Sequence, residues 1–368
     1  MIRLLVVDDS ALMRRLLVEL FEAEGDFDLA VARDGPEALA ALGEFAPDVI
    51  TLDVHMPGLN GLECLDRIMV MRPTPVVMVS ALTREGADET IQALELGAID
   101  VVPKPTGAVS LRMDELGPRL VQTVRAAATV RLRATRRLAE RVRARSGQVA
   151  PRATKLRRSP PPLASAPTPT PPPAKGHPPG LVIVGTSTGG PPALDALLKD
   201  LPADFPWPIV IAQHMPAAFT SALARRLDSL CALAVSEVTG PTQLRPGCAY
   251  VGRGDADLII AGRANGPVAM AAPEAREHRW HPSVDRLTDS AMEHLPSVRL
   301  IGVLMTGMGD DGAAAMTRLH KNGGRTIAEA EETAVVWGMP GALVHAGGAD
   351  FVLPLDAIGR GLMDLVAA

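Results

Sequence analysis

The sequence has few aromatic residues, few cysteines and no long apolar run, and each shortage excludes a class of protein. The chain has 368 residues but only three Trp, one Tyr and six Phe, so aliphatic side chains must fill its cores. Cys64, Cys231 and Cys248 have neither paired nor metal-ligand spacing, which is typical of a reducing compartment. No stretch approaches the roughly 18 apolar residues of a membrane span, and the start MIRLLVVDDS lacks the apolar core of a signal peptide. We therefore expect a cytoplasmic protein that is not inserted in a membrane.

The length and composition favour a globular protein of two domains. Hydrophobic residues make up 47% of the chain and charged residues 21%, which excludes a disordered protein. A single compact domain usually has about 100 to 200 residues, so two cores are expected. The formal net charge of -5 says little about partners, because the strongest basic run is confined to one segment.

Short β-branched runs alternate with helix-like segments from residue 2 to about residue 107. The runs LLVV, DVITLD and PVVMVS are separated by helix-like segments such as Ala11 to Ala23 and Pro36 to Glu44. This alternation predicts a parallel sheet covered by helices on both faces. In such a sheet the ligand site lies at the carboxyl ends of the strands, so the residues that follow each strand are the candidate site residues.

A basic segment and a proline-rich segment separate this region from the rest of the chain. Leucine, valine and alanine recur at four-residue spacing from about residue 111, which predicts a long helix up to residue 146. Nine arginines against the single acid Glu140 occupy 119 to 145, so this part is either a solvated face or a contact for a receptor, a kinase or nucleic acid. Residues 151 to 180 combine proline with small residues and predict an extended, semi-rigid linker.

Apolar runs resume at Leu181 and predict a second α/β domain. The runs LVIV, PIVIA, DLIIA and LIGVLM are interleaved with helix-like stretches at 191 to 199, 221 to 227 and 312 to 321. We therefore expect an α/β protein of two doubly wound parallel-sheet domains, the first flavodoxin-like and the second Rossmann-like, joined by a basic helix and a proline-rich linker. The expected boundaries are 1–118 for the first domain, 119–179 for the connection and 180–368 for the second domain.

Acidic and phosphate-binding residue types follow the strands of the first domain. Asp8 and Asp9 follow the first strand, Asp53 the third, Ser80 the fourth and Lys104 the fifth. Three carboxylates brought together repel unless a cation binds, and an all-oxygen set suits Mg²⁺. A phosphoryl group on Asp53 would gain the cation, the Lys104 charge and the Ser80 hydroxyl as partners. Taken singly, an Asp pair after a strand is also common as a helix N-cap, and a lysine before proline is also common at a surface.

The motifs DDS, LDVHMPGLNG, VSA and PKP, in this order and spacing, resemble the receiver domain of two-component response regulators. The resemblance implies that Asp53 accepts the phosphoryl group, that Asp8 and Asp9 help to hold Mg²⁺, and that Ser80 and Lys104 sense the phosphoryl group. Most receivers carry an aromatic residue three positions before the lysine, where this chain has Val101. The usual aromatic rotamer switch is therefore not expected here.

A serine follows the first strand of the second domain in the sequence GTSTG. The glycines at 185 and 189 allow a tight strand-to-helix turn that exposes Ser187, and the Thr188 amide at the helix start is placed to stabilise an oxyanion. A serine needs a base, and histidine is the natural choice near neutral pH. His214 follows the strand PIVIAQ, and Asp311 lies in the loop MTGMGDDGA, where it can orient an imidazole. On the pattern alone, His214 can instead be a capping residue, and the loop can instead bind phosphate or a metal.

The motifs VGTSTGGPPAL, AQHMP, HPSVDRL, LMTGMGDDGA and AEETAVVWGMP resemble, in order, the catalytic domain of chemotaxis protein-glutamate methylesterases. The resemblance implies that Ser187 is the nucleophile, His214 the base and Asp311, rather than Asp310, the orienting acid, with no cofactor. The backbone at Thr188 and Met308 would form the oxyanion hole. Family members hydrolyse glutamyl methyl esters of chemoreceptors, releasing methanol, and many also deamidate receptor glutamines. Trp280 departs from the family, which often has histidine there, and this departure bears on substrate preference.

The two resemblances together imply a phosphorylation-controlled enzyme of chemotaxis adaptation. Its expected partners are methylated chemoreceptors as substrate and a chemotaxis histidine kinase as phosphodonor, at receptor arrays but without membrane insertion and without nucleic acid. We expect the unphosphorylated first domain to cover the cleft containing Ser187 and phosphorylation of Asp53 to release it. The alternative functions are a signalling adaptor with a non-hydrolytic second domain, a transcriptional regulator and a nucleotide-binding enzyme. The last two are disfavoured because the second half has no helix-turn-helix pattern and no GxGxxG or GxxxxGK motif.

Overall fold

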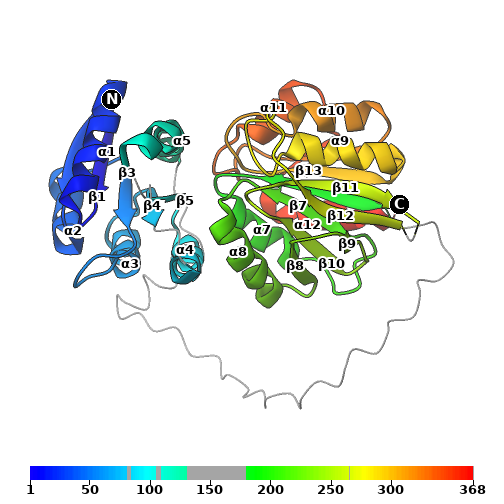
Figure 1. The fold of residues 1–368 in the computed structure, drawn as a ribbon, viewed down its shortest axis with the longest axis horizontal. Coiled ribbons are helices and arrows are strands. Elements are labelled where there is room, and N and C mark those ends of the chain that lie inside the picture. Colours follow the sequence, from blue (N-terminus) through cyan, green and yellow to red (C-terminus); the bar gives the residue numbers. More distant parts are fainter. Residues whose placement is uncertain (81–83, 105–108, 131–179, 265, 368) are drawn as a thin grey trace, which may run out of the picture. The chain divides into compact units, whose positions relative to one another are not determined.

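The computed structural model describes residues 1–80, 84–104, 109–130, 180–264 and 266–367. The predicted basic helix beyond residue 130 and the proline-rich linker lie outside these ranges. Residues 1–132 and 179–368 belong to one compact unit, in which two separate parallel sheets form two domains (Figure 1). No helix in the described part of the chain is both long and apolar enough to span a bilayer.

The first domain is a five-stranded parallel sheet with the strand order β2-β1-β3-β4-β5, as expected for a flavodoxin-like fold. Helices α1 and α5 pack on one face, and α2, α3 and α4 cover the other (Figure 1). The strands are β1 (Ile2–Val7), β2 (Phe27–Ala32), β3 (Val49–Asp53), β4 (Val76–Ser80) and β5 (Asp100–Pro103). The helices are α1 (Ala11–Glu24), α2 (Gly35–Glu44), α3 (Gly61–Met71), α4 (Arg84–Leu96) and α5 (Val109–Thr129).

Side-chain caps fix where the first three helices begin. The side chains of Ser10, Asp34 and Asn60 each accept a hydrogen bond from a backbone amide in the first turn of α1, α2 or α3. Asn60 also forms a reciprocal capping box with Glu63. These caps begin each helix soon after the preceding strand, so residues at the strand ends stay at one edge of the sheet.

Helix α5 continues past residue 118, where we expected the first domain to end. Leu120, Val121, Val124 and Ala127 are almost completely buried and join the core formed by α1 and the sheet. The apolar spacing in the sequence indicates that the first half of this helix can pack on a sheet, but the boundary at 118 placed the part with the arginines in the connection. Because apolar burial rather than charge fixes a helix on its sheet, the first core extends to about residue 128.

The second domain is built on a seven-stranded parallel sheet with the order β15-β14-β13-β6-β7-β10-β8. Helices α9, α10 and α11 cover one face, and α7, α8 and α12 the other (Figure 1). Its strands are β6 (Leu181–Thr186), β7 (Ile209–Gln213), β8 (Ala234–Val238), β10 (Cys248–Gly252), β13 (Leu300–Leu304), β14 (Arg325–Glu329) and β15 (Phe351–Leu353). Its helices are α7 (Gly190–Lys199), α8 (Ala217–Leu230), α9 (Val284–His294), α10 (Ala313–Lys321), α11 (Met339–His345) and α12 (Leu355–Ala367), and a 3₁₀ turn covers Ser297–Arg299.

One run that the sequence suggested for the parallel sheet belongs to a second, antiparallel sheet. The run DLIIA lies in β11 (Asp257–Arg263), which pairs with β12 (Gly266–Ala272), and β12 also pairs with the short β9 (Thr242–Gln243). Only two residues separate the two long strands in the sequence, and such a short connection permits only antiparallel pairing. Periodicity alone does not distinguish these two kinds of strand.

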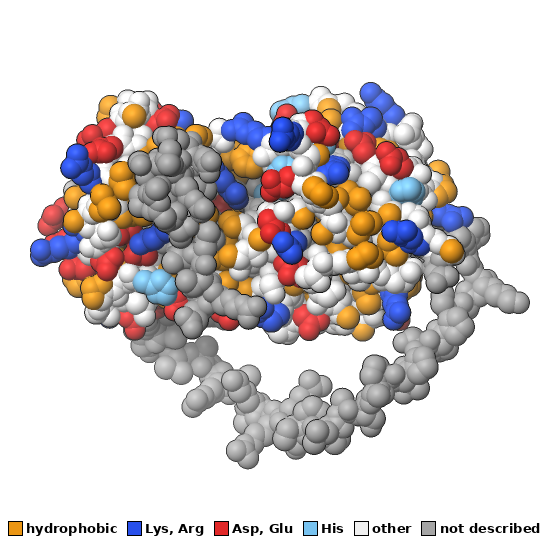
Figure 2. Space-filling view, viewed as in Figure 1, with side chains coloured by type: hydrophobic (Ala, Val, Ile, Leu, Met, Phe, Trp, Pro, Cys, Tyr) orange, Lys and Arg blue, Asp and Glu red, His pale blue; other side chains and the backbone are white. Residues whose placement is uncertain are grey.

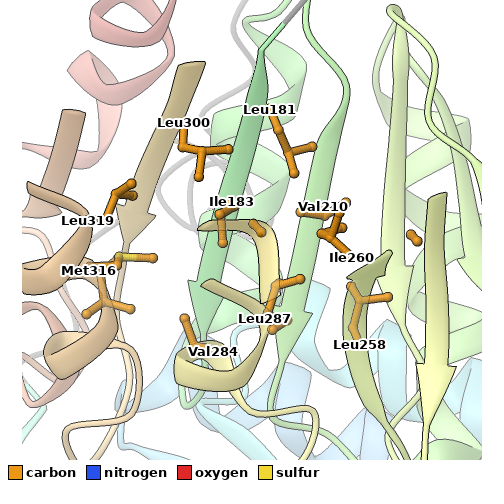
Figure 3. Packing of buried hydrophobic residues seen from close by; sticks show 14 of the residues in the cluster. Leu181, Ile183, Val210, Leu258, Ile260, Val284, Leu287, Leu300, Met316 and Leu319 are labelled. Carbon is orange, nitrogen blue, oxygen red and sulfur yellow. The ribbon is translucent and has the colours of Figure 1, made fainter. Parts of the chain in front are cut away.

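The core of the second domain is aliphatic, as the shortage of aromatics requires. Figure 3 shows Leu181, Ile183 and Val210 of the large sheet with side chains from β11 and from helices α9 and α10. Val284 and Leu287 at the start of α9 are completely buried in this cluster. Helix α9 is thereby held firmly against the strand ends where the predicted catalytic residues lie.

Candidate active site and acidic cluster

Ser187 and His214 follow adjacent paired strands of the second domain. Thr186 at the end of β6 is in register with Gln213 at the end of β7. The His214 amide continues this ladder by donating to the Thr186 carbonyl at 3.0 Å. The backbone therefore places the two side chains at neighbouring positions on the carboxyl edge of the sheet.

Glycines around Ser187 are required by close packing. Gly189 has a φ of +78°, and a Cβ atom added at Gly190 would lie 1.9 Å from the Gln213 side-chain oxygen. A Cβ at Gly307 would lie 2.8 Å from the Ser187 Cβ and 3.1 Å from the Ser187 amide nitrogen. Any other residue at these positions would displace the turn that exposes the serine.

The side chain of Gln213 holds the same turn through two hydrogen bonds. Its side-chain oxygen accepts a hydrogen bond from the Thr186 hydroxyl at 2.6 Å, and its amide nitrogen donates to the Ser187 carbonyl at 2.9 Å. The residue is only 2% exposed. A buried side-chain amide with both ends bonded allows little movement of the serine backbone.

His214 and Asp311 form a buried pair. His214 Nε2 lies 2.8 Å from Asp311 Oδ2, and the two residues are 5% and 6% exposed. With the carboxylate as acceptor, Nε2 carries the proton and Nδ1 has a free lone pair. His214 Nδ1 is buried and has no hydrogen-bond partner among the described residues. This nitrogen is available to accept a proton.

Asp311 is held at the start of helix α9. Its carboxylate accepts hydrogen bonds from the Val284 amide at 2.7 Å, the Asp285 amide at 3.1 Å and the Ser283 hydroxyl at 3.0 Å. Burial acts to raise the pKa of Asp311, but these donors together with His214 outweigh it and lower the pKa. The carboxylate therefore stays charged, whereas the neighbouring Asp310 is exposed.

Two backbone amides near the serine are free to bind an oxyanion. Thr188 directly follows Ser187. Met308 directly follows Gly307, which packs so closely on Ser187 that an added Cβ would lie 2.8 Å from the Ser187 Cβ. Neither the Thr188 nor the Met308 amide donates to another atom of the described residues. Preorganised free donors of this kind stabilise negative charge that develops on a carbonyl oxygen.

Trp280 lies against the imidazole of His214. The ring centroids of the two residues are 5.7 Å apart and the planes are inclined by 16°, a stacked arrangement. The sequence drew attention to Trp280 only as a departure from a family pattern. Its contact with the candidate base is a result of the tertiary structure.

In the first domain, Asp8, Asp9 and Asp53 form an acidic cluster at the strand ends. Each offers a carboxylate oxygen within 4.8 Å of the others. Lys104 bridges two of them, with its Nζ atom 2.8 Å from Asp8 Oδ2 and 2.6 Å from Asp53 Oδ2. Ser80, the last residue of β4, is completely buried at the same edge.

Burial and charge act in opposite directions on this cluster. Burial raises the pKa of Asp53, and the nearby Lys104 only partly offsets it. The pKa of Lys104 is raised, because its bonds to Asp53 and Asp8 outweigh the effect of burial. Three carboxylates with one ammonium group leave net negative charge, and oxygen ligands at this spacing fit a hard divalent cation. A cavity of about 440 Å³ opens beside the cluster, with Asp9 and His55 in its lining.

Sequence reasoning missed several residues that position the candidate catalytic groups. Gln213 supports the serine turn, Ser283 supports Asp311, and Glu329 accepts the Thr306 amide at 2.8 Å. Thr306 in turn accepts the Ser187 amide with its carbonyl oxygen. For Gln213 and Glu329 the signal available in the sequence was a polar residue at the end of an apolar run, and for Ser283 it was a serine before a helix-like stretch. Many such residues have no role in a site, so the pattern does not single these out.

The chain matches two family models. Residues 182–362 match the CheB methylesterase model, and residues 4–113 match the response regulator receiver domain model. A protein-glutamate methylesterase/protein-glutamine glutaminase 2 of Rhodopseudomonas palustris (strain BisB18) is 56% identical over 99% of this chain and 98% of its own length. A protein-glutamate methylesterase/protein-glutamine glutaminase 3 of Rhodospirillum rubrum is 49% identical over 97% of this chain and 94% of its own length. The crystal structure of the Thermotoga maritima CheB methylesterase catalytic domain is 39% identical with a TM-score of 0.49, covering 51% of this chain and 98% of that chain.

Proposed function

The chain belongs to the CheB methylesterase family, and from this premise we propose that it hydrolyses glutamyl methyl esters of chemoreceptors under the control of its receiver domain. We propose that it also deamidates receptor glutamines. The observation that carries this proposal is the buried His214–Asp311 pair, whose free Nδ1 atom lies at the strand end next to Ser187. Ester and amide substrates share one acyl-enzyme route and differ only in the leaving group.

In the proposed reaction, the Ser187 hydroxyl oxygen attacks the ester carbonyl carbon while His214 Nδ1 takes the hydroxyl proton. Asp311 holds the ring through Nε2 and stabilises its positive charge. The amides of Thr188 and Met308 bind the oxyanion of the tetrahedral intermediate. The carbon–methoxy bond then breaks, and His214 gives its proton to the leaving oxygen, so methanol departs. Water, activated by His214, hydrolyses the glutamyl–serine ester and restores the enzyme.

In the receiver domain, Asp53 is the proposed phosphoacceptor. Asp8, Asp9 and Asp53 would hold Mg²⁺, which supplies charge neutralisation for the phosphoryl group when bound. Lys104 already contacts Asp53 and Asp8, so phosphorylation would redirect its ammonium group to the new phosphoryl oxygens. Ser80 at the neighbouring strand end would donate a hydrogen bond to the phosphoryl group. The proposed phosphodonor is a chemotaxis histidine kinase, and the proposed substrates are methylated receptors at membrane arrays.

Contacts between the two domains support control of the esterase by the receiver. The Thr188 hydroxyl, one residue after Ser187, donates to Asp100 Oδ2 of strand β5 at 2.7 Å. Arg225 on α8 lies 2.8 Å from Asp88 on α4. A receiver domain bound beside Ser187 would block the access of a receptor helix to the nucleophile. We propose that phosphorylation of Asp53 weakens these contacts and opens the cleft.

The direct test is methanol release from methylated receptor membranes by the purified chain, with and without a small phosphodonor. We expect release that rises with the phosphodonor and is lost in Ser187→Ala. The matched control is Ser236→Ala, which removes an exposed hydroxyl from the edge strand β8 and should leave the rate unchanged. Equal release by the wild type and Ser187→Ala would overturn the proposed nucleophile. No release from any methylated receptor, by a folded protein, would favour the non-hydrolytic adaptor.

A further inference from the structure

We propose that Trp280 is a positioning residue for the reaction proposed above, holding the imidazole of His214 in place and stabilising its protonated form with the indole face. The two rings stack with centroids 5.7 Å apart and an interplanar angle of 16°. Asp311 fixes the edge of the imidazole, but a single hydrogen bond leaves rotation about that bond possible. A flat ring against the face removes this freedom.

Trp280 is itself held by a buried carboxylate. Asp257, completely buried at the start of β11, accepts hydrogen bonds from the amides of Ala275 at 3.0 Å and Ser283 at 2.8 Å. His281, next to the tryptophan, bonds to the same carboxylate at 2.8 Å. The segment that carries Trp280 is therefore tied on both sides of the indole to one fixed group.

The glycine loop of Asp311 leaves room for the indole. A Cβ atom added at Gly309 would lie 3.5 Å from the Trp280 Nε1 atom, and Gly309 has a φ of +86°. The tryptophan thus contacts both the base and the loop that carries the orienting acid. From this position the indole covers the imidazole of His214 and contacts the loop that holds Asp311.

The indole acts on the charge that His214 acquires during the reaction. A cation over an aromatic face is attracted by the ring quadrupole, and the effect is larger away from water. His214 is faced by the Asp311 carboxylate from the loop before α10, and Asp285 on α9 lies next to that carboxylate. Two guanidinium groups also lie at the indole. Their central carbons are 5.2 Å (Arg279) and 6.0 Å (Arg119 on α5) from the Trp280 ring centroid.

The test compares Trp280→Phe, which keeps an aromatic face, with Trp280→Leu, which keeps apolar bulk only. Both are measured as kcat and kcat/KM for methanol release across pH, after the folded state is checked by circular dichroism. We expect Phe to keep the acid-side midpoint of kcat/KM, and Leu to lower it by roughly half a pH unit because protonated His214 loses its aromatic partner. Leu should also lower kcat about tenfold through loss of orientation, with little change in KM.

Trp207→Leu is the matched control, because Trp207 packs against Gly180 rather than against His214. It should move neither the midpoint nor kcat. An identical profile for the Leu and Phe variants of Trp280, or an equal change in Trp207→Leu, would reduce Trp280 to a merely structural residue and overturn the proposal.

A second measurement separates this proposal from the function it rests on. A protonated imidazole stacked on an indole quenches its fluorescence, so the wild type should show a pH-dependent step in tryptophan emission without any substrate. The step from this pair is the part that disappears in Trp280→Phe and in His214→Asn, because Trp337, whose ring centroid lies 5.6 Å from that of His345, can give a separate step in every variant. Its presence without methanol release would leave the stacking intact and reject the ester substrate, whereas its absence in a folded wild type would reject the stacking.

Discussion

At the residue scale, two adjacent aspartates in one loop have different environments. Asp311 is buried and bonded to His214 and to the first amides of α9, whereas Asp310 is exposed. The spacing of residues does not distinguish them, because both follow the same glycine. The resemblance to the methylesterase motifs pointed to Asp311, and the contact with helix α9, which is distant in sequence, gives the physical reason for that choice.

Asp311→Asn is expected to lower kcat about 10³-fold to 10⁴-fold, because the neutral amide no longer stabilises the imidazolium. The matched variant Asp310→Asn should retain the wild-type rate within about twofold, as for most exposed substitutions. Both are measured as methanol release under saturating substrate. Similar losses in the two variants would contradict the assignment of the orienting acid.

Glu329 is a second buried carboxylate whose charge state can be tested. It is completely buried, and burial raises its pKa above the ordinary 4.5 despite the amide of Thr306 and the hydroxyl of Thr333. A raised pKa means that the folded state favours the protonated acid. Its contribution to stability is therefore complete below the ordinary pKa and is lost as the pH rises through the raised value.

Glu329→Gln, which stays neutral, should gain stability relative to the wild type as the pH rises from 4 to 8, by on the order of 1 kcal/mol. Urea unfolding at several pH values measures this difference. The exposed Glu331→Gln is the control and should show no such trend. A constant difference across the pH range for Glu329→Gln would contradict the raised pKa.

At the element scale, loops that follow three strands of the second sheet create the candidate active site. The loop after β6 carries Ser187, the loop after β7 carries His214, and the loop after β13 carries Asp311. Because β13, β6 and β7 are neighbours and parallel, these loops meet at one edge. The glycines of the loops set the distance between them.

Gly307→Ala tests this close packing. The added Cβ would meet the Ser187 Cβ at 2.8 Å, so the serine turn must shift and kcat should fall at least tenfold while the protein stays folded. Gly43→Ala in helix α2 is the control, since its Cβ would meet nothing within 4 Å. That variant should keep full activity and gain roughly 0.5 to 1 kcal/mol of stability. Full activity in Gly307→Ala would show that the turn tolerates displacement.

At the scale of the whole molecule, a signalling domain and a hydrolytic domain are joined in one chain. On the face in Figure 2, basic and acidic side chains are interspersed over the described residues. A nucleic-acid-binding surface normally gathers basic side chains on one face, and the described residues on this face show no such gathering. The contacts of Asp100 and Asp88 with the esterase domain favour a role in control of catalysis.

Asp100→Ala is expected to raise methanol release by the unphosphorylated protein several-fold, because Thr188 loses its partner beside the nucleophile. Asp88→Ala, which removes an ion pair whose side chains are 62% and 73% exposed, should change the rate little. Rates are measured without phosphodonor. An unchanged rate in Asp100→Ala would argue against a block at this contact.

Asp53→Asn should abolish the response to a phosphodonor while leaving the unstimulated rate unchanged. Phosphate incorporation measured alongside methanol release distinguishes loss of phosphorylation from loss of coupling. Asp9→Asn should instead weaken phosphorylation in a way that rising Mg²⁺ concentration restores. A full response in Asp53→Asn would reject both the phosphoacceptor and the gating mechanism.

The sequence by itself determined the two α/β domains, since hydrophobic periodicity and strand-end motifs are local properties that the chain carries whatever its packing. It also indicated the candidate catalytic residues and the acidic cluster, because parallel strands bring their carboxyl ends to one edge. The tertiary structure decided what depends on contacts distant in sequence: the antiparallel pairing of β11, the extension of the first core along α5, and the supporting roles of Gln213 and Ser283. The stacking of Trp280 on His214 belongs to the same group, because the two residues are 66 positions apart in the sequence and only the packed sheet and the segment bonded to Asp257 bring them together.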